Sequence, residues 1–143
     1  MSNKGAPPGV LGRLRLNHVA LVCADIEACE AFYGGLLGLS VVWRPDPDNV
    51  YLSSGTDNLA LHRGVPQGGG ALDHIGFSVG TPDEVDAWHE RLQAASVPIA
   101  AAPRTHRDGS RSLYCRDPGG VLVQLIHLPP QALSPAAGLV PER

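Results

Sequence analysis

Hydrophobic and polar residues alternate in two short stretches of the chain, and each stretch gives way to a helical pattern. The alternation spans about residues 14–23 and 72–79, and a period of two indicates a strand with one buried face. Apolar residues then recur three or four positions apart, over about 26–37 and 82–95. The pattern therefore predicts a strand followed by a helix, twice.

Three short runs that favour strands follow each predicted helix. They cover about residues 39–44, 49–53 and 58–63 after the first helix, and about 97–102, 111–116 and 121–127 after the second. Pro, Gly, Asn and Asp separate the runs, as is typical of turns. Each half of the chain is therefore predicted to have the order β-α-β-β-β.

The predicted helices carry recognisable start signals. Thr81 is placed as the N-cap of the second helix, with Pro82 at its first position and Glu84 completing a capping box. Asp25 is the expected cap of the first helix, which should end at the glycines of "GGLLG". The expected buried face of the first helix consists of Ile26, Cys29, Phe32 and Leu36.

The two halves are copies of one unit. "LNHVALVCADIEACEAFYGGLLG" aligns with "LDHIGFSVGTPDEVDAWHERLQA" without a gap and sets His18 on His74. Further on, "SSGTDNLALH" lies over "DPGGVLVQLI" and sets Ala60 on Gln124. We therefore predict units at 13–66 and 67–128, a mobile extension at 1–12, and a Pro/Ala-rich tail at 129–143.

Composition and charge narrow the possible partners. A chain of 143 residues with 43% hydrophobic and 17% charged residues fits one ordinary globular domain. A net charge of -3 without a basic run does not favour nucleic acid, and no apolar run approaches the roughly 20 residues that cross a bilayer. The three cysteines lack metal-type spacing and the first residues lack a signal-peptide core, so we expect reduced thiols in the cytoplasm.

Strand alternation gathers the polar residues on one face of each predicted sheet. The opposite face is apolar and should lie under the helices. Small residues, Ala20 and Gly76, follow two positions after His18 and His74 and leave room for a ligand. The predicted cavity face carries His18, His74, Gln124, His62, Asn58 and Tyr114.

Gln124 is the least expected of these residues, because the rest of its strand is apolar. Burying an unpaired amide costs roughly a few kcal/mol. The side chain must therefore find either hydrogen-bond partners or a metal ion, and the strand pattern leaves both open.

Three stretches of the chain, in this order, resemble the vicinal oxygen chelate superfamily: "LNHVALVCADIEACEAFYGGLLGL", "LDHIGFSV" and "SLYCRDPGGVLVQLIHL". That superfamily includes glyoxalase I, extradiol dioxygenases, fosfomycin resistance enzymes and bleomycin resistance proteins. The resemblance runs from about Leu14 to Leu128. It implies an α+β fold in which two paired βαβββ units form a cupped mixed sheet around a divalent metal ion, usually in a homodimer.

The resemblance also implies a ligand set. The family's metal positions fall on His18, Ala60, His74 and Gln124, so two histidines match and the Ala60 position is vacant. Gln124 stands where a glutamate is usual, and a neutral amide oxygen should bind a cation more weakly than a carboxylate. His62 lies on the same face as Ala60, about 7 Å further along the strand, and could supply a further donor.

Two more residues resemble the dioxygenase members. Tyr114 precedes Gln124 by the spacing of their active-site tyrosine, and His106 lies in the loop of their second histidine. In such a mechanism Tyr114 would bond a substrate oxygen and His106 would carry a proton. His62 and Asn58 are expected to line the substrate pocket.

Two functions follow as alternatives. The first is metal-dependent chemistry on a small oxygenated substrate, dioxygenase-like or glyoxalase-like, with Fe²⁺, Mn²⁺, Ni²⁺ or Zn²⁺. The second is metal-free binding of a small molecule by a resistance protein of the bleomycin type, in which Gln124 would hydrogen-bond His18 and His74.

Overall fold

The computed structural model describes residues 11, 16–68 and 70–130, and the order of elements within them matches the sequence prediction. The predicted extension at 1–12 and tail at 129–143 lie almost wholly outside the described residues. The first unit consists of β1 (His18–Cys23), α1 (Ile26–Glu30), η1 (Ala31–Leu36), β2 (Ser40–Asp46), β3 (Asn49–Ser53) and β4 (Asn58–Arg63).

The second unit consists of β5 (Ile75–Ser78), α2 (Pro82–Ala94), β6 (Ile99–Thr105), β7 (Arg111–Arg116) and β8 (Leu122–His127). The predicted bounds of four strands were wrong by two or more residues, including the start of β1, which is His18 rather than residue 14, and the end of β2, which is Asp46 rather than residue 44. β5 begins at Ile75 rather than at residue 72, because its neighbour β8 offers its first partner, Val123, opposite Ile75. β6 continues to Thr105 because β7 begins at Arg111, directly opposite.

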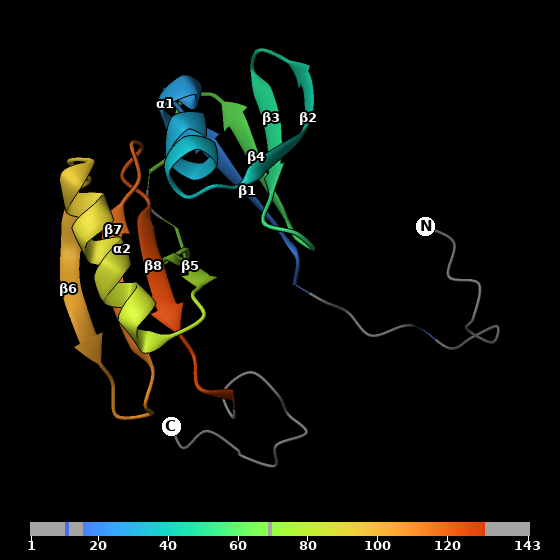
Figure 1. Ribbon diagram of the computed structural model, residues 1–143. Coiled ribbons are helices and arrows are strands. Elements are labelled where there is room, and N and C mark those ends of the chain that lie inside the picture. Colours follow the sequence, from blue (N-terminus) through green and yellow to red (C-terminus); the bar gives the residue numbers. More distant parts are fainter. Residues whose placement is uncertain (1–10, 12–15, 69, 131–143) are drawn as a thin grey trace.

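Both units form a four-stranded mixed sheet with the same topology. The strand orders are β1-β4-β3-β2 and β5-β8-β7-β6, and in each sheet only the first pair is parallel. Figure 1 shows the first unit in blue and green above the second unit, which runs from yellow-green to red. The predicted α+β fold of two paired βαβββ units is confirmed.

The predicted first helix changes character halfway along. It is α-helical only to Glu30, and the following turns are π-helical, with the Leu37 amide donating to the Phe32 carbonyl at 2.9 Å. A π-turn adds a residue per turn and so rotates the following side chains. Tyr33, seven residues after Ile26 on the same helical face, is fully buried although it was not among the residues expected there.

The helices cover one face of each sheet. α1 and η1 pack on the first sheet and α2 on the second, and their apolar side chains form one continuous core. The apolar face predicted from alternation is therefore confirmed, and no helix of the described residues covers the opposite faces. Core residues include Leu21, Leu59, Leu61, Ile26, Cys29 and Phe32 from the first unit, and Leu113, Val123, Leu125, Val85 and Leu92 from the second.

One buried polar contact joins the two units. The Tyr33 hydroxyl donates a 2.7 Å hydrogen bond to Oδ2 of Asp117, which is also buried. Oδ1 of Asp117 accepts from the backbone amides of Gly119 and Val121, at 2.8 Å each. Burial raises the pKa of Tyr33, so its hydroxyl remains a donor and fully pairs the carboxylate.

The N-cap residues predicted for both helices, Asp25 and Thr81, form the expected capping hydrogen bonds. The Asp25 side chain accepts from the Ala28 amide at 3.0 Å, and Thr81 Oγ1 accepts from the Glu84 amide at 3.3 Å. The Glu84 carboxylate reaches one residue further back than in a standard capping box and accepts from the Gly80 amide at 3.1 Å. No helix in the described part of the chain is long and apolar enough to cross a membrane.

Candidate functional site

The strand registers sort the candidate residues onto two surfaces that no helix covers. We call them the first open face and the second open face. The first open face carries His18, Ala20, Trp43, Tyr51, Asn58, Ala60 and His62, and the second carries His74, Gly76, Arg104, Ser112, Tyr114 and Gln124.

On the first open face, Asn58 fixes the orientation of His18. The two residues pair directly between β1 and β4, and Nδ1 of His18 lies 2.8 Å from Oδ1 of Asn58. Because an amide oxygen can only accept, the imidazole proton belongs on Nδ1. The lone pair is then on Nε2, which is free to bind a metal ion or a substrate.

On the second open face, Asp73 does the same for His74. Nδ1 of His74 lies 2.6 Å from Oδ2 of Asp73, so Nε2 again carries the lone pair. An oxygen acceptor behind the ring orients a metal-binding histidine. The two histidines of the repeat therefore share one arrangement, although their partners come from different elements.

Gln124 forms a cluster with Tyr114 and His74. Its Nε2 donates to the Tyr114 hydroxyl at 2.9 Å, and the Tyr114 ring packs edge-on to His74 with 5.3 Å between centroids. Within the described residues no hydrogen bond reaches Oε1 of Gln124. A Cβ on Gly76, the strand neighbour of Gln124, would lie 3.6 Å from that oxygen, so the glycine keeps the space beside it clear.

A cleft between the two units brings both histidines to one surface. It encloses about 490 Å³, and His18, Asn58, His74 and Gly76 are among its lining residues. Within the described residues, however, no three His, Cys, Asp or Glu side chains are arranged to hold a metal ion. One chain therefore does not join His18 to the His74–Asp73 pair as a three-donor set.

The donors present still suit a divalent ion. Two imidazole nitrogens and an amide oxygen are acceptable ligands for zinc, nickel, iron or manganese. The hydrogen bonds behind both imidazoles are those expected of metal-binding histidines. Ala60 is fully buried and has no donor, which leaves the fourth position vacant.

His106 occupies a place further along the second open face. Its Nε2 lies 2.7 Å from Ser112 Oγ, and its Nδ1 lies 3.3 Å from the guanidinium of Arg104. Because arginine only donates, Nδ1 must accept and the imidazole proton belongs on Nε2. Both nitrogens are engaged, and Ser112, the partner of Nε2, lies two residues before Tyr114 on β7.

His62 is held in a similar way, but away from His18. Its Nδ1 lies 2.6 Å from Oδ1 of Asn49, and its ring meets Tyr51 edge-on at 5.9 Å. It pairs with Val22, four residues along β1 from His18. This separation argues against a shared ligand set with His18, and His62 is not among the residues that line the cleft described above.

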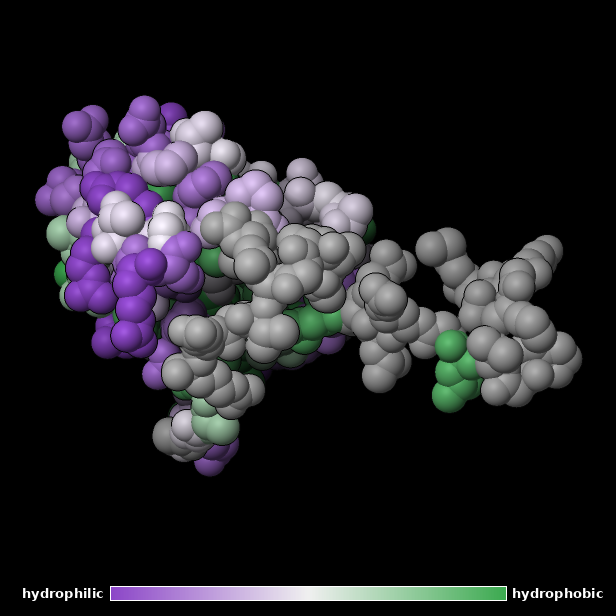
Figure 2. All heavy atoms as spheres, turned by 90° about the horizontal axis from the view of Figure 1, so that it is seen from below, coloured by the Kyte–Doolittle hydropathy of each residue, from purple (hydrophilic) through white to green (hydrophobic). Residues whose placement is uncertain are grey.

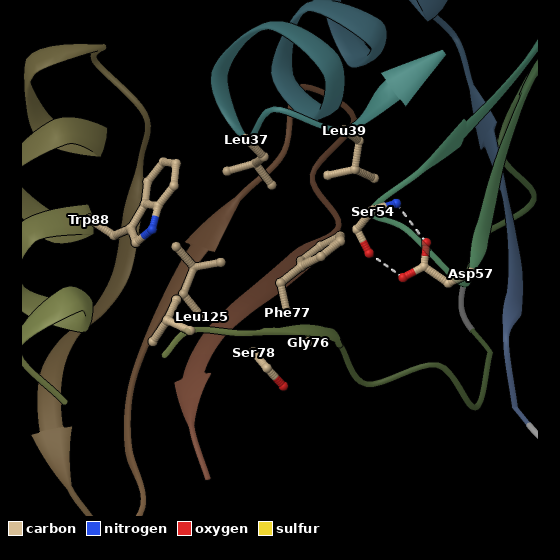
Figure 3. Close-up of a pocket in the computed structure, with 10 residues that line it drawn as sticks. Leu37, Leu39, Ser54, Asp57, Gly76, Phe77, Ser78, Trp88 and Leu125 are labelled. Carbon is tan, nitrogen blue, oxygen red and sulfur yellow. Dashed lines mark hydrogen bonds between the residues drawn. The ribbon is translucent and has the colours of Figure 1, made fainter. Parts of the chain in front are cut away.

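A second cavity, of about 350 Å³, lies between the units next to the cleft (Figure 3). It shares Leu39, Asp57, Gly76 and Phe77 with the cleft, so a groove follows the junction of the units. Its wall is mainly apolar, and the indole of Trp88 faces it from α2. Seen from below, hydrophobic residues are exposed near the middle of the molecule, whereas the left side of the view is mostly hydrophilic (Figure 2).

Asp57 is the charged residue of this groove. The Ser54 hydroxyl and backbone amide both donate to its carboxylate (Figure 3), and these hydrogen bonds lower its pKa. The Asp57 carboxylate is thus already hydrogen-bonded within its own turn between β3 and β4.

Sequence reasoning missed Asp73 and the pair Arg104 and Ser112 as partners of functional histidines. The repeat contained a signal for the first, since "LNH" and "LDH" place an acceptor before each histidine. Asp73 uses that position, but His18 takes Asn58 from the neighbouring strand instead of Asn17. No local pattern signals the Arg104 and Ser112 contacts, because they depend on how the loop between β6 and β7 folds back.

Comparison with known proteins agrees with this arrangement. Residues 15–125 match the family model described as the Glyoxalase/Bleomycin resistance protein/Dioxygenase superfamily. The structure is similar to that of lactoylglutathione lyase from Agrobacterium tumefaciens, with a TM-score of 0.66, 27% identity, and coverage of 85% of this chain and 96% of that one. No curated protein matches the chain.

Two further structures are similar at the level of the fold. The fosfomycin resistance protein FosX of Listeria monocytogenes has a TM-score of 0.71 at 20% identity, with 84% of this chain and 98% of that chain covered. A superfamily enzyme of Burkholderia phytofirmans has a TM-score of 0.70 at 19% identity, with 79% and 98% covered.

Proposed function

Because the chain belongs to the Glyoxalase/Bleomycin resistance protein/Dioxygenase superfamily, we propose that it is a metal-dependent enzyme acting on a small oxygenated molecule. His18, His74 and Gln124 would hold a divalent ion, Fe²⁺, Mn²⁺, Ni²⁺ or Zn²⁺, and the reaction would be dioxygenase-like or glyoxalase-like. The observation that carries the proposal is the matching pair of hydrogen bonds at Nδ1 of the two histidines, which leaves both Nε2 atoms free.

Tyr114 is the proposed catalytic residue beside these ligands. A bound divalent ion would supply a Lewis acid for two neighbouring substrate oxygens. The Tyr114 oxygen accepts from Gln124 Nε2, so its own proton is free to be donated to a substrate oxygen. The same hydrogen bond turns Oε1 of Gln124 away from Tyr114 and toward the space beside Gly76.

A proton-carrying role for His106 stays a proposal that needs one rearrangement. Its Nδ1 accepts from Arg104, so uptake of a proton there requires that contact to open. Ser112 lies between His106 and the Tyr114 end of β7 and would link the imidazole to the site.

A homodimer would complete the site. One chain carries His18 with Asn58 on the first open face and His74 with Tyr114 and Gln124 on the second. If the first open face of one copy covers the second open face of its partner, a two-fold axis creates two equivalent cavities. Each cavity would contain His18 from one chain and His74 and Gln124 from the other.

Mixing two variants tests this arrangement. His18→Ala and His74→Ala homodimers each lack a ligand in both sites, whereas a heterodimer of the two has one site with both histidines. After unfolding and refolding of an equal mixture, statistical pairing predicts about a quarter of the wild-type metal content. Metal content no higher than that of either variant alone would contradict a shared site.

A second candidate function rests on Gln124 itself. Its amide is already paired with Tyr114 without any ion, and the side chain is only 8% exposed. That favours a metal-free protein that binds and sequesters a small molecule. Ligand affinity unchanged by a chelator would support this second function over the first.

The proposed location is the cytoplasm. The chain's three cysteines, Cys23, Cys29 and Cys115, are free and buried, which suits a reducing compartment.

A further inference from the structure

The second cavity continues the cleft that both candidate histidines line. Four residues line both spaces, namely Leu39, Asp57, Gly76 and Phe77. In Figure 3 Leu39 and Asp57 lie toward one end of the second cavity, and Trp88 lies at the opposite end. The two spaces, of about 490 and 350 Å³, therefore form one groove that runs from the histidines to Trp88.

The proposed metal ligands of the second unit lie where the two spaces join. His74 lines the cleft together with Gly76. Oε1 of Gln124 lies beside the same glycine, 3.6 Å from the place where a Cβ on Gly76 would stand. Because Gly76 has no side chain and lines both spaces, an oxygen-bearing group bound at His74 and Gln124 would stand at the entrance of the second cavity.

The wall of the second cavity is mainly apolar and held in place. Its partly buried apolar side chains, which pack against the core, are Leu37, Phe77, Val79 and Trp88. The Phe77 ring lies 6.1 Å from the ring of buried Tyr33, and the Arg91 guanidinium lies 5.0 Å from the Trp88 ring. Covering the exposed parts of such side chains with an apolar group of a ligand is favourable.

The charge at the entrance narrows the choice of occupant. The hydrogen bonds from Ser54 lower the pKa of Asp57, so its carboxylate is ionised and would repel an anion. Beyond it, Leu37, Leu125 and Trp88 offer no partner of opposite charge to a charged group. An uncharged apolar chain suits both parts of the path.

We propose that the substrate of this protein carries an uncharged aliphatic chain, which passes Gly76 and Phe77 into the second cavity and ends against Trp88. This inference rests on the proposed function, because it takes His74 and Gln124 as ligands of the ion that binds the substrate's oxygens. The cleft then selects the oxygenated head of the substrate, and the second cavity selects the length of its chain.

A series of straight-chain hydroxamic acids tests the inference. Acetohydroxamate, butyrohydroxamate, hexanohydroxamate and octanohydroxamate present the same two neighbouring oxygens on chains of increasing length. With Zn²⁺ present, the affinity measured by calorimetry should rise about threefold to fourfold for each added methylene, until the second cavity is filled.

Matched variants assign this gain to the second cavity. Leu37→Trp fills the cavity and should abolish the gain, and Trp88→Ala removes the far wall and should weaken octanohydroxamate much more than acetohydroxamate. Val65→Trp adds the same bulk at an exposed residue that lines neither space, so it should leave the gain unchanged.

The fluorescence of Trp88 reports the chain directly. In Trp43→Phe protein Trp88 is the remaining tryptophan of two. Because an aliphatic chain would exclude water from the indole, octanohydroxamate should shift its emission to shorter wavelengths, and acetohydroxamate should not.

Three outcomes count against the inference. Equal binding of all four probes, or a gain that Leu37→Trp and Trp88→Ala leave unchanged, would overturn it and leave the proposed function standing. If no probe binds, the proposed function fails together with it. If Trp88 emission is already that of a buried indole and no probe moves it, the chain itself or a second copy fills the groove, and the inference is wrong.

Discussion

Nε2 of Gln124 donates a hydrogen bond of 2.9 Å to the hydroxyl oxygen of Tyr114. The contact pairs the buried amide through its nitrogen, and it leaves the amide oxygen as the free end. The same side chain can therefore be satisfied without a metal ion and still offer an oxygen ligand to one. The proposed function depends on that oxygen, and the metal-free candidate depends on the nitrogen.

Replacing Tyr114 by Phe should separate stability from metal binding. The change removes the acceptor of a buried amide, so the free energy of unfolding should fall by about 1–2 kcal/mol, measured by urea titration. Metal content should stay near that of the wild type, because Oε1 of Gln124 is not involved in the lost contact. Tyr51→Phe is the control, since no described residue hydrogen-bonds its hydroxyl, and it should change stability by less than about 0.5 kcal/mol.

Asn58 and Asn49 provide a matched pair for the question of which histidine binds metal. Asn58→Ala removes the acceptor behind His18 and should weaken metal binding about tenfold or more, measured by competition with a chromogenic chelator. Asn49→Ala removes the acceptor behind His62 and should leave the affinity unchanged. The reverse result would make His62 the ligand and exclude His18.

The contact between Tyr33 and Asp117 should stabilise the junction of the two units. Tyr33→Phe leaves a buried carboxylate with only its backbone donors, at an expected loss of about 1.5–3 kcal/mol in urea unfolding. Asp117→Asn should cost less, because the uncharged amide oxygen is easier to bury. A loss below about 0.5 kcal/mol for Tyr33→Phe would mean that solvent replaces the hydroxyl.

The buried thiols predict how stability depends on pH. Burial raises the pKa of Cys23 from 9.0 to about 12, so the folded protein resists ionisation of a group that ionises more readily when unfolded. This contribution is fully present below pH 9.0 and is lost as the pH rises toward about 12. The drop in unfolding free energy over that range should be smaller in Cys23→Ala, and an equal drop would contradict the assignment.

Much of the fold was predictable because the two halves repeat. The alignment of Ala60 with Gln124 predicted equivalent positions in the two sheets, and the registers confirm this, with Ala60 beside Ala20 and Gln124 beside Gly76. The burial of Tyr33 was missed although it lies seven residues after Ile26 on the same helical face, whereas the π-turn that contains it was not predictable from the period. Gly34 permits that turn to lie close to β3, where an added Cβ would meet the Leu52 side chain at 3.2 Å.

The candidate site was predictable only in part. Sequence identified the histidines, but their partners depend on contacts across strands and loops, as the bond from His18 to Asn58 shows. The stacking of Trp43 on Tyr51 depends on an irregular register between β2 and β3, which brings the two residues opposite each other. A regular register continued from the pair of Val41 and Leu52 would have placed a different residue opposite Tyr51.

Metal binding by Gln124 variants tests the central claim most directly. Protein purified without chelator should bind Mn²⁺ or Zn²⁺ at close to one ion per chain, and Gln124→Glu should bind at least about tenfold more tightly because it adds a carboxylate. Gln124→Leu should lose the ion. If neither the wild type nor Gln124→Glu holds a divalent ion near stoichiometry, the metal-dependent function proposed for His18, His74 and Gln124 is wrong.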